Sequence, residues 1–307
     1  MSDLLTADDL IQPFRVDSLV ARGRLVRLGG VVDAILAQHD YPEPVSVLLG
    51  EALALTAALA DTLKFDGTFT TQIQGDGPVR LMIADYRTDG AMRGYAGFDA
   101  AALGDAVPPG TAGNAGLFGG GHLAFTVDQG PDQDRYQGMV PLEGNTLAET
   151  ARSYLTRSEQ LRAEIDVAAV RWPAENGAAP AWRAGCLVVQ QMPESDGRSG
   201  DDRSQIARWA ETRTQVARLR RTDLADPLAI APALIGPLFR DYDVRLHEPR
   251  PVRFECRCSH ERAANVVRAL PEADRVDLAI DGRLEITCDY CNAQYLFGVD
   301  GSAIDQT

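Results

Sequence analysis

Four of the chain's five cysteines lie in two close pairs near its end, within FECRCSHERAANVVRALPEADRVDLAIDGRLEITCDYC (residues 254–291). One residue separates Cys256 from Cys258, and two residues separate Cys288 from Cys291. In an extended strand, residues two apart point to the same side, so both sulfurs of the first pair can face one metal. Four thiolates complete a tetrahedral zinc shell. We therefore interpret the four cysteines as ligands of one Zn²⁺ per chain.

The same spacing permits redox chemistry. Each pair could oxidise within itself and would then lose two metal ligands, although a C-x-C disulfide ring should be strained. A module of this size buries little core, so its folding free energy would come largely from the metal, on the order of 10 kcal/mol. A purely structural metal site is the ordinary role of four cysteines, and the C-x-C pair is the feature that also permits a redox switch.

Composition limits the class of protein. The 307 residues carry a formal net charge of −14, and the segment 250–307 has seven arginines against ten carboxylates. Nucleic-acid binding relies on cations that neutralise phosphate, so the acidic charge of the whole chain and of the cysteine module argues against a nucleic-acid-binding protein. The start, MSDLLTADDLIQPF, has no basic region before an apolar run, and no stretch predicts a membrane span. We expect a cytoplasmic protein, where clustered cysteines indicate metal or redox chemistry.

The alternation of strand and helix patterns predicts an α+β fold in three parts. Residues 1–196 are expected to form a mixed core domain, 197–247 a helical linker and 248–307 the four-cysteine zinc module. VSVLLGEALALTAALADTL is apolar on most sides and predicts a core helix. The segment 64–98 predicts three strands joined by glycine-rich turns, and the polar run 193–202 is taken as the first boundary.

The linker is expected to cover a sheet of the core domain. Residues 203–239 contain many apolar side chains interrupted by prolines, and their apolar face needs a partner. We predict that this segment packs over the sheet while the zinc module is folded and detaches when the metal is lost. The apolar side chains are Ile206, Trp209, Val216, Leu219, Leu224, Leu228, Ile230, Leu234, Ile235, Leu238 and Phe239.

Longer motifs resemble one family. The run DVRLHEPRPVRFECRCSHER…ITCDYCNAQYLF is similar to the C-terminal region of the heat shock protein 33 family, the 33 kDa redox-regulated bacterial chaperones. The first domain resembles the same family in GRLVRL, HDYPEPV, LLGEALALTAALA, LKFDGTFTTQIQGDGPVRLMIADYR, AFTVDQG, RYQGMVPLEG and YLTRSEQL. These motifs extend over most of the chain in the family's order.

The resemblance implies a holdase, a chaperone that binds unfolding proteins without ATP and is inactive while reduced and zinc-bound. Hypochlorite, or peroxide with heat, would release the zinc and form the disulfides Cys256–Cys258 and Cys288–Cys291. The module and linker would then unfold. The resemblance also implies homodimers in the oxidised state, and transfer of clients to ATP-driven refolding chaperones.

Two other classes of protein stay open. A zinc-ribbon protein associated with nucleic acid would explain the cysteines but conflicts with the acidic charge. An enzyme in the first domain is the second alternative, although the four histidines form no recognisable catalytic arrangement, and we assign no catalytic residue.

Four further features carry weaker signals. Cys186 is expected to be a buried core cysteine rather than a third redox thiol. His260 could replace a thiolate as a ligand, but four cysteines already fill a tetrahedron. The only lysine, Lys64, lies outside any Walker pattern, so no ATP site is predicted. The sequence offers no physical account of Ser158–Glu159–Gln160.

Overall fold

The computed structural model describes residues 8–104, 114–173, 179–193 and 202–304. The chain divides into two compact units, Met1–Phe254 and Glu255–Thr307. Each unit contains both helices and strands, so the expected α+β class is confirmed. The expected boundaries after residues 196 and 247 stay predictions, and the first of them lies outside the described residues.

The first unit contains two six-stranded sheets. Sheet A has the order β10–β1–β2–β9–β8, with β11 also paired to β1, and all its pairs are antiparallel. Its strands are β1 (Leu10–Val16), β2 (Ala21–Leu28), β8 (Ala163–Trp172), β9 (Ala181–Gln191), β10 (Val244–Leu246) and β11 (Arg250–Pro251).

Sheet B has the order β12–β5–β4–β3–β6–β7, and only the β12–β5 pair is parallel. Its strands are β3 (Thr68–Gly75), β4 (Val79–Arg87), β5 (Ala91–Phe98), β6 (Gly121–Asp128), β7 (Tyr136–Pro141) and β12 (Arg253–Phe254). The expected three strands within residues 64–98 are therefore confirmed as β3, β4 and β5. Gly90 turns the chain between β4 and β5 with φ 88°, a conformation that glycine adopts without steric cost.

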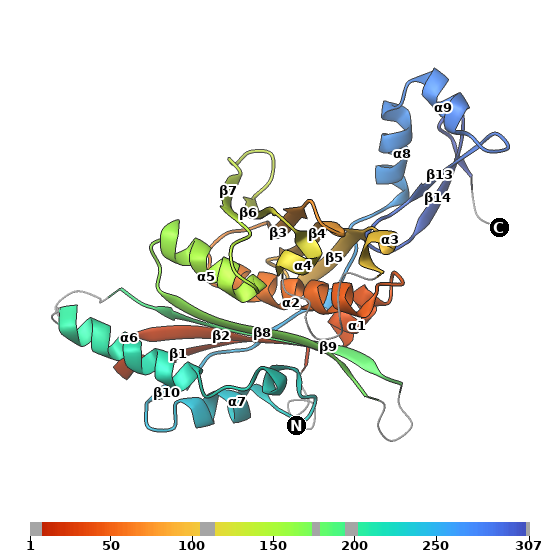
Figure 1. Cartoon of the computed structure of the whole chain (residues 1–307). Coiled ribbons are helices and arrows are strands. Elements are labelled where there is room, and N and C mark those ends of the chain that lie inside the picture. Colours follow the sequence, from red (N-terminus) through yellow and green to blue (C-terminus); the bar gives the residue numbers. More distant parts are fainter. Residues whose placement is uncertain (1–7, 105–113, 174–178, 194–201, 305–307) are drawn as a thin grey trace. The chain divides into compact units, whose positions relative to one another are not determined.

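The long helix α2 (Glu43–Ala60) packs between the two sheets, with α1 (Gly30–Leu36) and α5 (Leu147–Arg157) beside it (Figure 1). It is apolar on most sides because both of its faces are covered, and its buried side chains join one core with both sheets. Its length and apolar composition alone would suit a membrane span, but 83% of it is buried as in a core helix. The remaining short helices of this region are η1 (Asp17–Leu19), α3 (Ala100–Leu103) and α4 (Asn114–Phe118).

The linker helices cover the face of sheet A that lies opposite α2 (Figure 1). They are α6 (Asp202–Val216), η2 (Arg221–Ala225) and α7 (Ala231–Leu238). Together with strand residues of β1, β2, β8 and β9, these helices form a second apolar core, which confirms the expected packing of the linker over a sheet. The linker contributes Val216, Leu224, Ala231, Ile235, Leu238 and Phe239 to the buried part of this core.

Two of the expected linker contacts are wrong. Ile206 is 56% exposed and Leu228 is 84% exposed, whereas Val216 is only 2% exposed. The buried residues in the described part of α6 are Thr212, Gln215 and Val216, all in its C-terminal half, whereas Ile206 lies on an earlier turn that is not buried.

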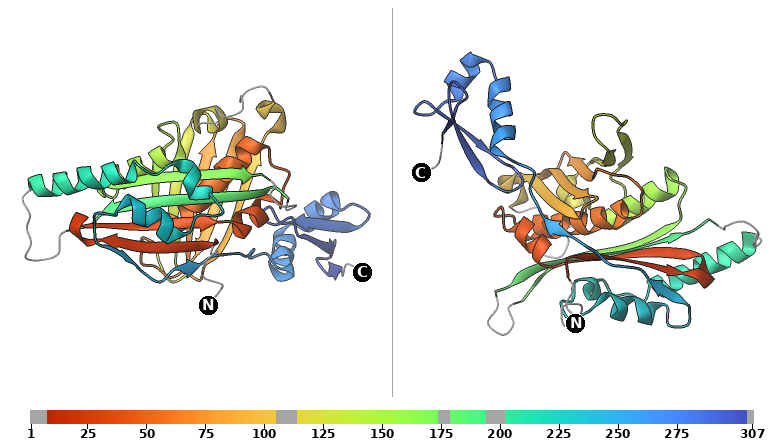
Figure 2. Two further views of the ribbon diagram at one scale, coloured as in Figure 1. Left: turned by 90° about the horizontal axis from the view of Figure 1, so that it is seen from below. Right: turned by 180° about the vertical axis from the view of Figure 1, so that it is seen from behind.

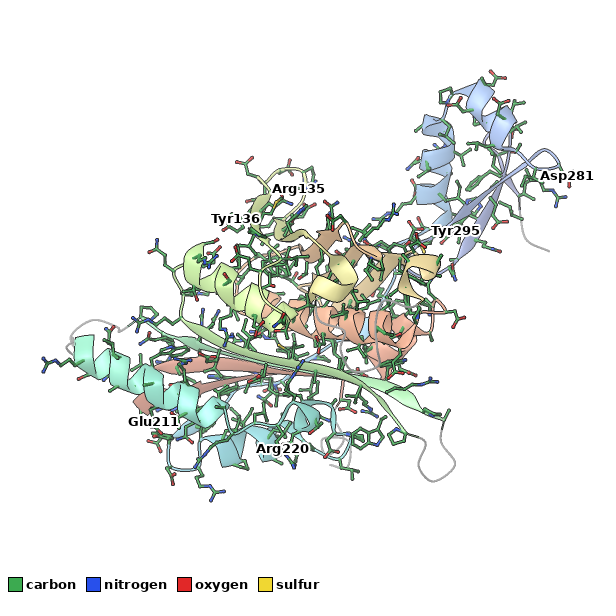
Figure 3. All side chains as sticks on the ribbon, in the orientation of Figure 1. Arg135, Tyr136, Glu211, Arg220, Asp281 and Tyr295 are labelled. Carbon is green, nitrogen blue, oxygen red and sulfur yellow. The ribbon has the colours of Figure 1, made fainter. Side chains whose placement is uncertain are left out.

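Polar contacts also hold the linker on the first unit. The Arg221 guanidinium donates to the Val167 carbonyl oxygen at 2.7 Å and to Oε1 of Glu51, on α2, at 2.7 Å. Within the linker, the Tyr242 hydroxyl donates to Oε1 of Glu211 at 2.8 Å, and Glu211 lies on α6 (Figure 3). The Arg221 contacts thus tie η2 to β8 and α2, whereas the Tyr242 contact joins two parts of the linker.

Residues 244–254, which we name the strap, connect the linker to the cysteines. The strap contains β10, β11 and β12, so it pairs first with β1 of sheet A and then with β5 of sheet B (Figure 2). Its His247 carbonyl accepts a hydrogen bond from Nε2 of Gln12 at 2.6 Å. Arg250 pairs with Asp61, and Arg253 lies 3.0 Å from the Asp89 carboxylate.

The second unit is small. It consists of α8 (His260–Ala269), α9 (Glu272–Leu278) and a sheet of β13 (Arg283–Thr287), β14 (Gln294–Gly298) and β15 (Ala303–Ile304). Among its described residues, the apolar cluster has five buried side chains, namely Ala263, Ala264, Val267, Leu284 and Phe297. A core of this size supplies little folding free energy.

Candidate metal centre

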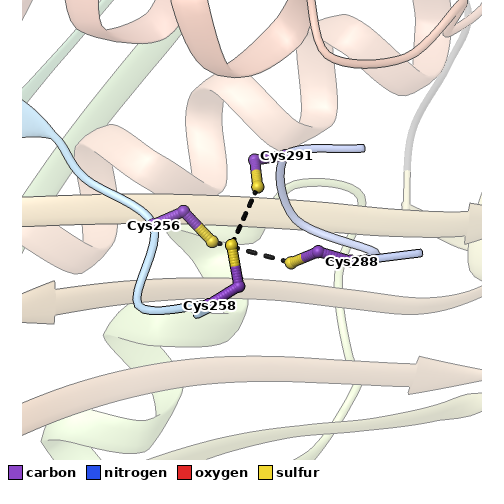
Figure 4. Close-up of side chains that lie close together, drawn as sticks. All are labelled: Cys256, Cys258, Cys288 and Cys291. Carbon is purple, nitrogen blue, oxygen red and sulfur yellow. Dashed lines mark hydrogen bonds between the residues drawn. The ribbon is translucent and has the colours of Figure 1, made fainter. Parts of the chain in front are cut away.

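The structure brings Cys256, Cys258, Cys288 and Cys291 into one cluster whose Sγ atoms all lie within 4.8 Å of one another (Figure 4). The Sγ atoms of Cys256 and Cys288 are 3.6 Å apart, and those of Cys258 and Cys291 are 3.3 Å apart. A disulfide needs about 2.05 Å. All five cysteines are therefore free thiols, and each of these two contacts joins a cysteine of the first pair to one of the second pair.

Two short loops position the thiols. Cys256 and Cys258 follow β12 directly and precede α8, whose first turn is capped by the Ser259 hydroxyl. Cys288 and Cys291 occupy the turn between β13 and β14, where the Cys288 carbonyl oxygen accepts from the backbone N–H of Asn292 at 2.8 Å. Asn292 has φ 56°, a left-handed conformation that asparagine tolerates better than most residues. This tight turn brings both of its sulfurs to the side of the first pair.

The donor set fits a zinc ion. With zinc–sulfur bonds of about 2.3 Å, the corners of a tetrahedral site are about 3.8 Å apart, which is close to the observed sulfur separations. Four thiols are soft ligands, and all four are half-buried, so one side of the cluster is shielded from water. The cluster is thus able to hold one metal ion that has the size of Zn²⁺ and its preference for four tetrahedral thiolate ligands.

The thiols are electrostatically unequal. Burial raises the pKa of Cys256, but hydrogen bonds from the Cys258 backbone N–H and from the neighbouring thiols outweigh it and lower that pKa to about 7. Burial raises the pKa of Cys291 and of Cys288. The Tyr295 hydroxyl donates to Sγ of Cys258 at 3.1 Å, and this bond raises the pKa of Tyr295 to about 12. The cluster therefore favours one thiolate, at Cys256, around neutral pH.

His260 is close to the cluster in sequence, but its ring packs against aromatic side chains. Its centroid lies 4.8 Å from that of Phe297 and 5.8 Å from that of Tyr295, both in edge-on geometry. Among the described residues, the group able to bind a metal consists of the four cysteines without His260. The histidine is exposed and contacts these two aromatic rings from the surface of the second unit.

Cys186 lies within sheet A, opposite Val26 on β2 and Val167 on β8, and is fully buried. Burial raises the pKa of its thiol far above the ordinary value, so it stays protonated and unreactive. This placement confirms the expectation of a core cysteine.

The acidic residue of Ser158–Glu159–Gln160 has a definite role that the sequence did not reveal. Oε1 of Glu159 accepts hydrogen bonds from the hydroxyls of Tyr136, at 2.6 Å, and Tyr154, at 2.5 Å. Gln160 adopts φ 54° and turns the chain from α5 toward β8. The segment thus joins β7 to α5 through a carboxylate shared by two tyrosines.

Comparisons with known proteins agree along almost the whole chain. A family model described as Hsp33 protein matches residues 9–298. The chain is 39% identical over 300 residues to the 33 kDa chaperonin of Caulobacter vibrioides strain NA1000, covering 96% of each protein. It is 34% identical over 293 residues to the 33 kDa chaperonin of Escherichia coli strain K12, covering 94% of this chain and 92% of the relative. The crystal structure of the 33 kDa chaperonin of Thermotoga maritima has a similar fold, with a TM-score of 0.76 at 21% identity over 95% of this chain and 96% of that one.

Proposed function

The chain belongs to the Hsp33 family, and from this premise we propose that it is a redox-regulated, ATP-independent holdase. The family resemblance seen in the sequence motifs is thereby confirmed. The observation that carries the proposal is the cluster of four thiols. The two cysteine pairs are separated in sequence, yet their sulfur atoms lie close enough together to bind one metal ion.

In the reduced state, Cys256, Cys258, Cys288 and Cys291 would act as four thiolate ligands. A bound Zn²⁺ would supply on the order of 10 kcal/mol of folding free energy to this unit. That contribution matters because the described part of the unit has a core of five buried side chains. The second unit would therefore be folded only while its thiols are reduced.

Oxidation would remove this support. Each pair of thiolates would lose two electrons to an oxidant such as hypochlorite, and one sulfur–sulfur bond would form in each pair. We propose the pairs Cys256–Cys258 and Cys288–Cys291, because neighbours in sequence stay close after the metal leaves. A sulfur held in a disulfide no longer serves as a thiolate ligand, so the metal would be released and the small unit would unfold.

The client-binding surface would come from the linker. Its apolar side chains cover one face of sheet A in the described structure. When the linker detaches, apolar surface becomes exposed both on the linker and on the sheet, and such surface binds unfolded chains. We further propose that the oxidised protein forms homodimers and passes its clients to ATP-driven refolding chaperones in the cytoplasm.

The alternative of a zinc-ribbon protein associated with nucleic acid is disfavoured by the net charge of −14. An enzymatic role finds no support in the relatives, which are named chaperonins. We propose a non-enzymatic binding function.

The test is suppression of light scattering from a client protein that unfolds on heating. We expect the oxidised protein to suppress aggregation and the reduced, zinc-loaded protein not to do so. Cys186→Ala is the matched control, because this buried cysteine lies outside the cluster and its loss should leave the redox response unchanged. Equal activity of the reduced and oxidised proteins would contradict the proposal.

A further inference from the structure

The first unit contains a cavity of about 220 Å³ at the C-terminal end of α2. The cavity lies between α2, strands β3 and β6 of sheet B, and α5, and its rim includes the exposed side chains of Leu63 and Tyr136. Tyr136 marks its β7 side (Figure 3). Its walls are mostly apolar and include Leu59, Phe65, Phe69, Phe125, Leu155 and Leu161. Such a site suits an apolar ligand oriented by a few polar groups.

One polar group on this cavity lacks a partner. Gln190 on β9 is 2% exposed, and its side-chain oxygen accepts from Nε of Arg22 at 3.1 Å. Its Nε2 atom is buried and has no hydrogen-bond partner among the residues that the structure describes. A buried donor without an acceptor costs about 1–3 kcal/mol. An acceptor atom on a ligand would recover this loss.

Arg22 supplies a positive charge beside that amide. It lines the cavity and is half-buried, yet it forms no ion pair with any carboxylate in the part of the chain that the structure describes. Arg24, two residues along the same strand and on the same face, pairs with Asp61. Burial and, secondarily, the charge of Arg24 lower the pKa of Arg22. Among the described residues, Arg22 is thus a cation without a directly paired carboxylate at the wall of an apolar cavity.

Two further charged groups orient a ligand. Lys64, the only lysine in the chain, lies on the rim of the cavity. Glu159 also lines the cavity, and the hydroxyls of Tyr136 and Tyr154 already donate to its carboxylate. A second carboxylate beside Glu159 would be repelled, whereas one beside Arg22 would be attracted. The charges therefore define a cationic end of the cavity.

We propose that this cavity binds a small apolar monocarboxylate, of the class of medium-chain fatty acids. The carboxylate accepts hydrogen bonds from the Arg22 guanidinium and from Nε2 of Gln190. The hydrocarbon chain lies among the phenylalanine and leucine side chains of the walls. This binding site is independent of the cysteine cluster and of the proposed redox response.

The test uses octanoate as the probe and octan-1-ol as the matched ligand without a charge. Isothermal titration calorimetry of the full-length reduced protein should show octanoate binding at least tenfold more tightly than octan-1-ol. Because Lys64 is the only lysine, its acylation by an amine-reactive ester, followed by mass spectrometry, reports directly on this cavity. Octanoate should slow that acylation, and acylation of the N-terminal amine serves as the internal reference.

The variant Arg22→Gln should lower the affinity for octanoate at least tenfold and abolish the preference over octan-1-ol. Arg80→Gln, a charge removal at an exposed side chain outside the cavity, should change neither value. Equal binding of the two probes by the wild-type protein would overturn the proposal. So would octanoate binding that leaves the acylation of Lys64 unchanged, and both results are independent of the folding of any variant.

Discussion

Val216→Asp is the sharpest test of the proposed role of the linker. Val216 ends α6, is 2% exposed and packs in the apolar core between the linker and sheet A. The substitution removes about 1.5–3 kcal/mol of hydrophobic stabilisation. It also places a carboxylate in that core, which costs several further kcal/mol if the linker stays docked. Short helices such as α7, which contains Pro237, are marginal without tertiary contacts, so we expect the linker to undock.

The matched control lies on the same helix. Ile206→Asp introduces the same charge in place of a similar apolar side chain, but Ile206 is 56% exposed and loses little on substitution. In the light-scattering assay, reduced and zinc-loaded Val216→Asp should suppress client aggregation without oxidant. Reduced Ile206→Asp should stay inactive until it is oxidised. Hydrogen exchange should show lost protection in the described linker residues only for Val216→Asp.

Two results would refute this reasoning. If Val216→Asp loses protection in the linker but stays inactive until oxidised, linker exposure alone does not create the client-binding surface. If both variants are equally active when reduced, the added charge rather than undocking is responsible. Retained zinc in both variants, measured after gel filtration, would show that the second unit is still folded in the assay.

Three other predictions follow from the described contacts. Chelation of the metal from the reduced protein should release one zinc per chain. It should also abolish hydrogen-exchange protection in residues 255–304, while strands β2 and β9 keep their protection. A metal content near zero in freshly purified reduced protein would contradict the assignment of the four cysteines as zinc ligands. Peptide mapping after mild oxidation should find Cys288–Cys291 first and Cys256–Cys258 second, because the C-x-x-C ring is less strained. Predominant Cys256–Cys288 or Cys258–Cys291 bonds would instead show that the sulfur contacts of 3.6 and 3.3 Å decide the pairing. Burial raises the pKa of Glu51 from 4.5 to about 7, although Arg221 lowers it. Because the raised pKa belongs to the folded state, the free energy of unfolding should fall as pH rises from 4.5 through 7, by at most about 3 kcal/mol. In urea unfolding at pH 5 and pH 8, Glu51→Gln should lack this pH-dependent part of the free energy of unfolding. Identical pH dependence of the wild-type protein and Glu51→Gln would refute the raised pKa of Glu51.

The sequence was most informative where local patterns decide the structure. The alternation within residues 64–98 correctly predicts β3, β4 and β5, because hairpin strands find their partners a few residues away. The long apolar run predicts α2 because a helix enclosed by two sheets has no polar face. The cysteine spacing predicts that four thiols converge, and the structure brings them together.

Long-range pairing was not predictable in the same way. Strand β1 contains Pro13, a residue that usually argues against a strand, and it was not expected. The strap pairs with β1 across more than 200 residues of sequence, and its strands are too short to carry a periodic pattern. Glu159 shares its carboxylate with Tyr136 and Tyr154, an arrangement that only the tertiary structure creates.

The linker illustrates a different limit. Its apolar composition correctly predicts that it covers a sheet, but composition does not say which turns of α6 reach that sheet. Ile206 and Val216 are both apolar and lie on the same helix, yet only Val216 is buried. The difference arises because only the C-terminal half of α6 lies over the second apolar core.

The strap determines how the cysteine cluster could control the linker. It separates the two in sequence, and it is anchored to both sheets of the first unit. Unfolding at Cys256 therefore reaches the linker only after β12 leaves β5 and after β11 and β10 leave β1. The β12–β5 and β11–β1 pairings are two residues long, and the β10–β1 pairing is three residues long. The side chains of Arg250 and Arg253 are 58% and 48% exposed, so solvent screens their ion pairs. Asp61 keeps Arg24 as a partner when Arg250 departs, so the buried carboxylate is not left unpaired. The proposed signal thus passes along a series of short strand pairings, and it also has to release Val252, which is buried in the main core of the first unit.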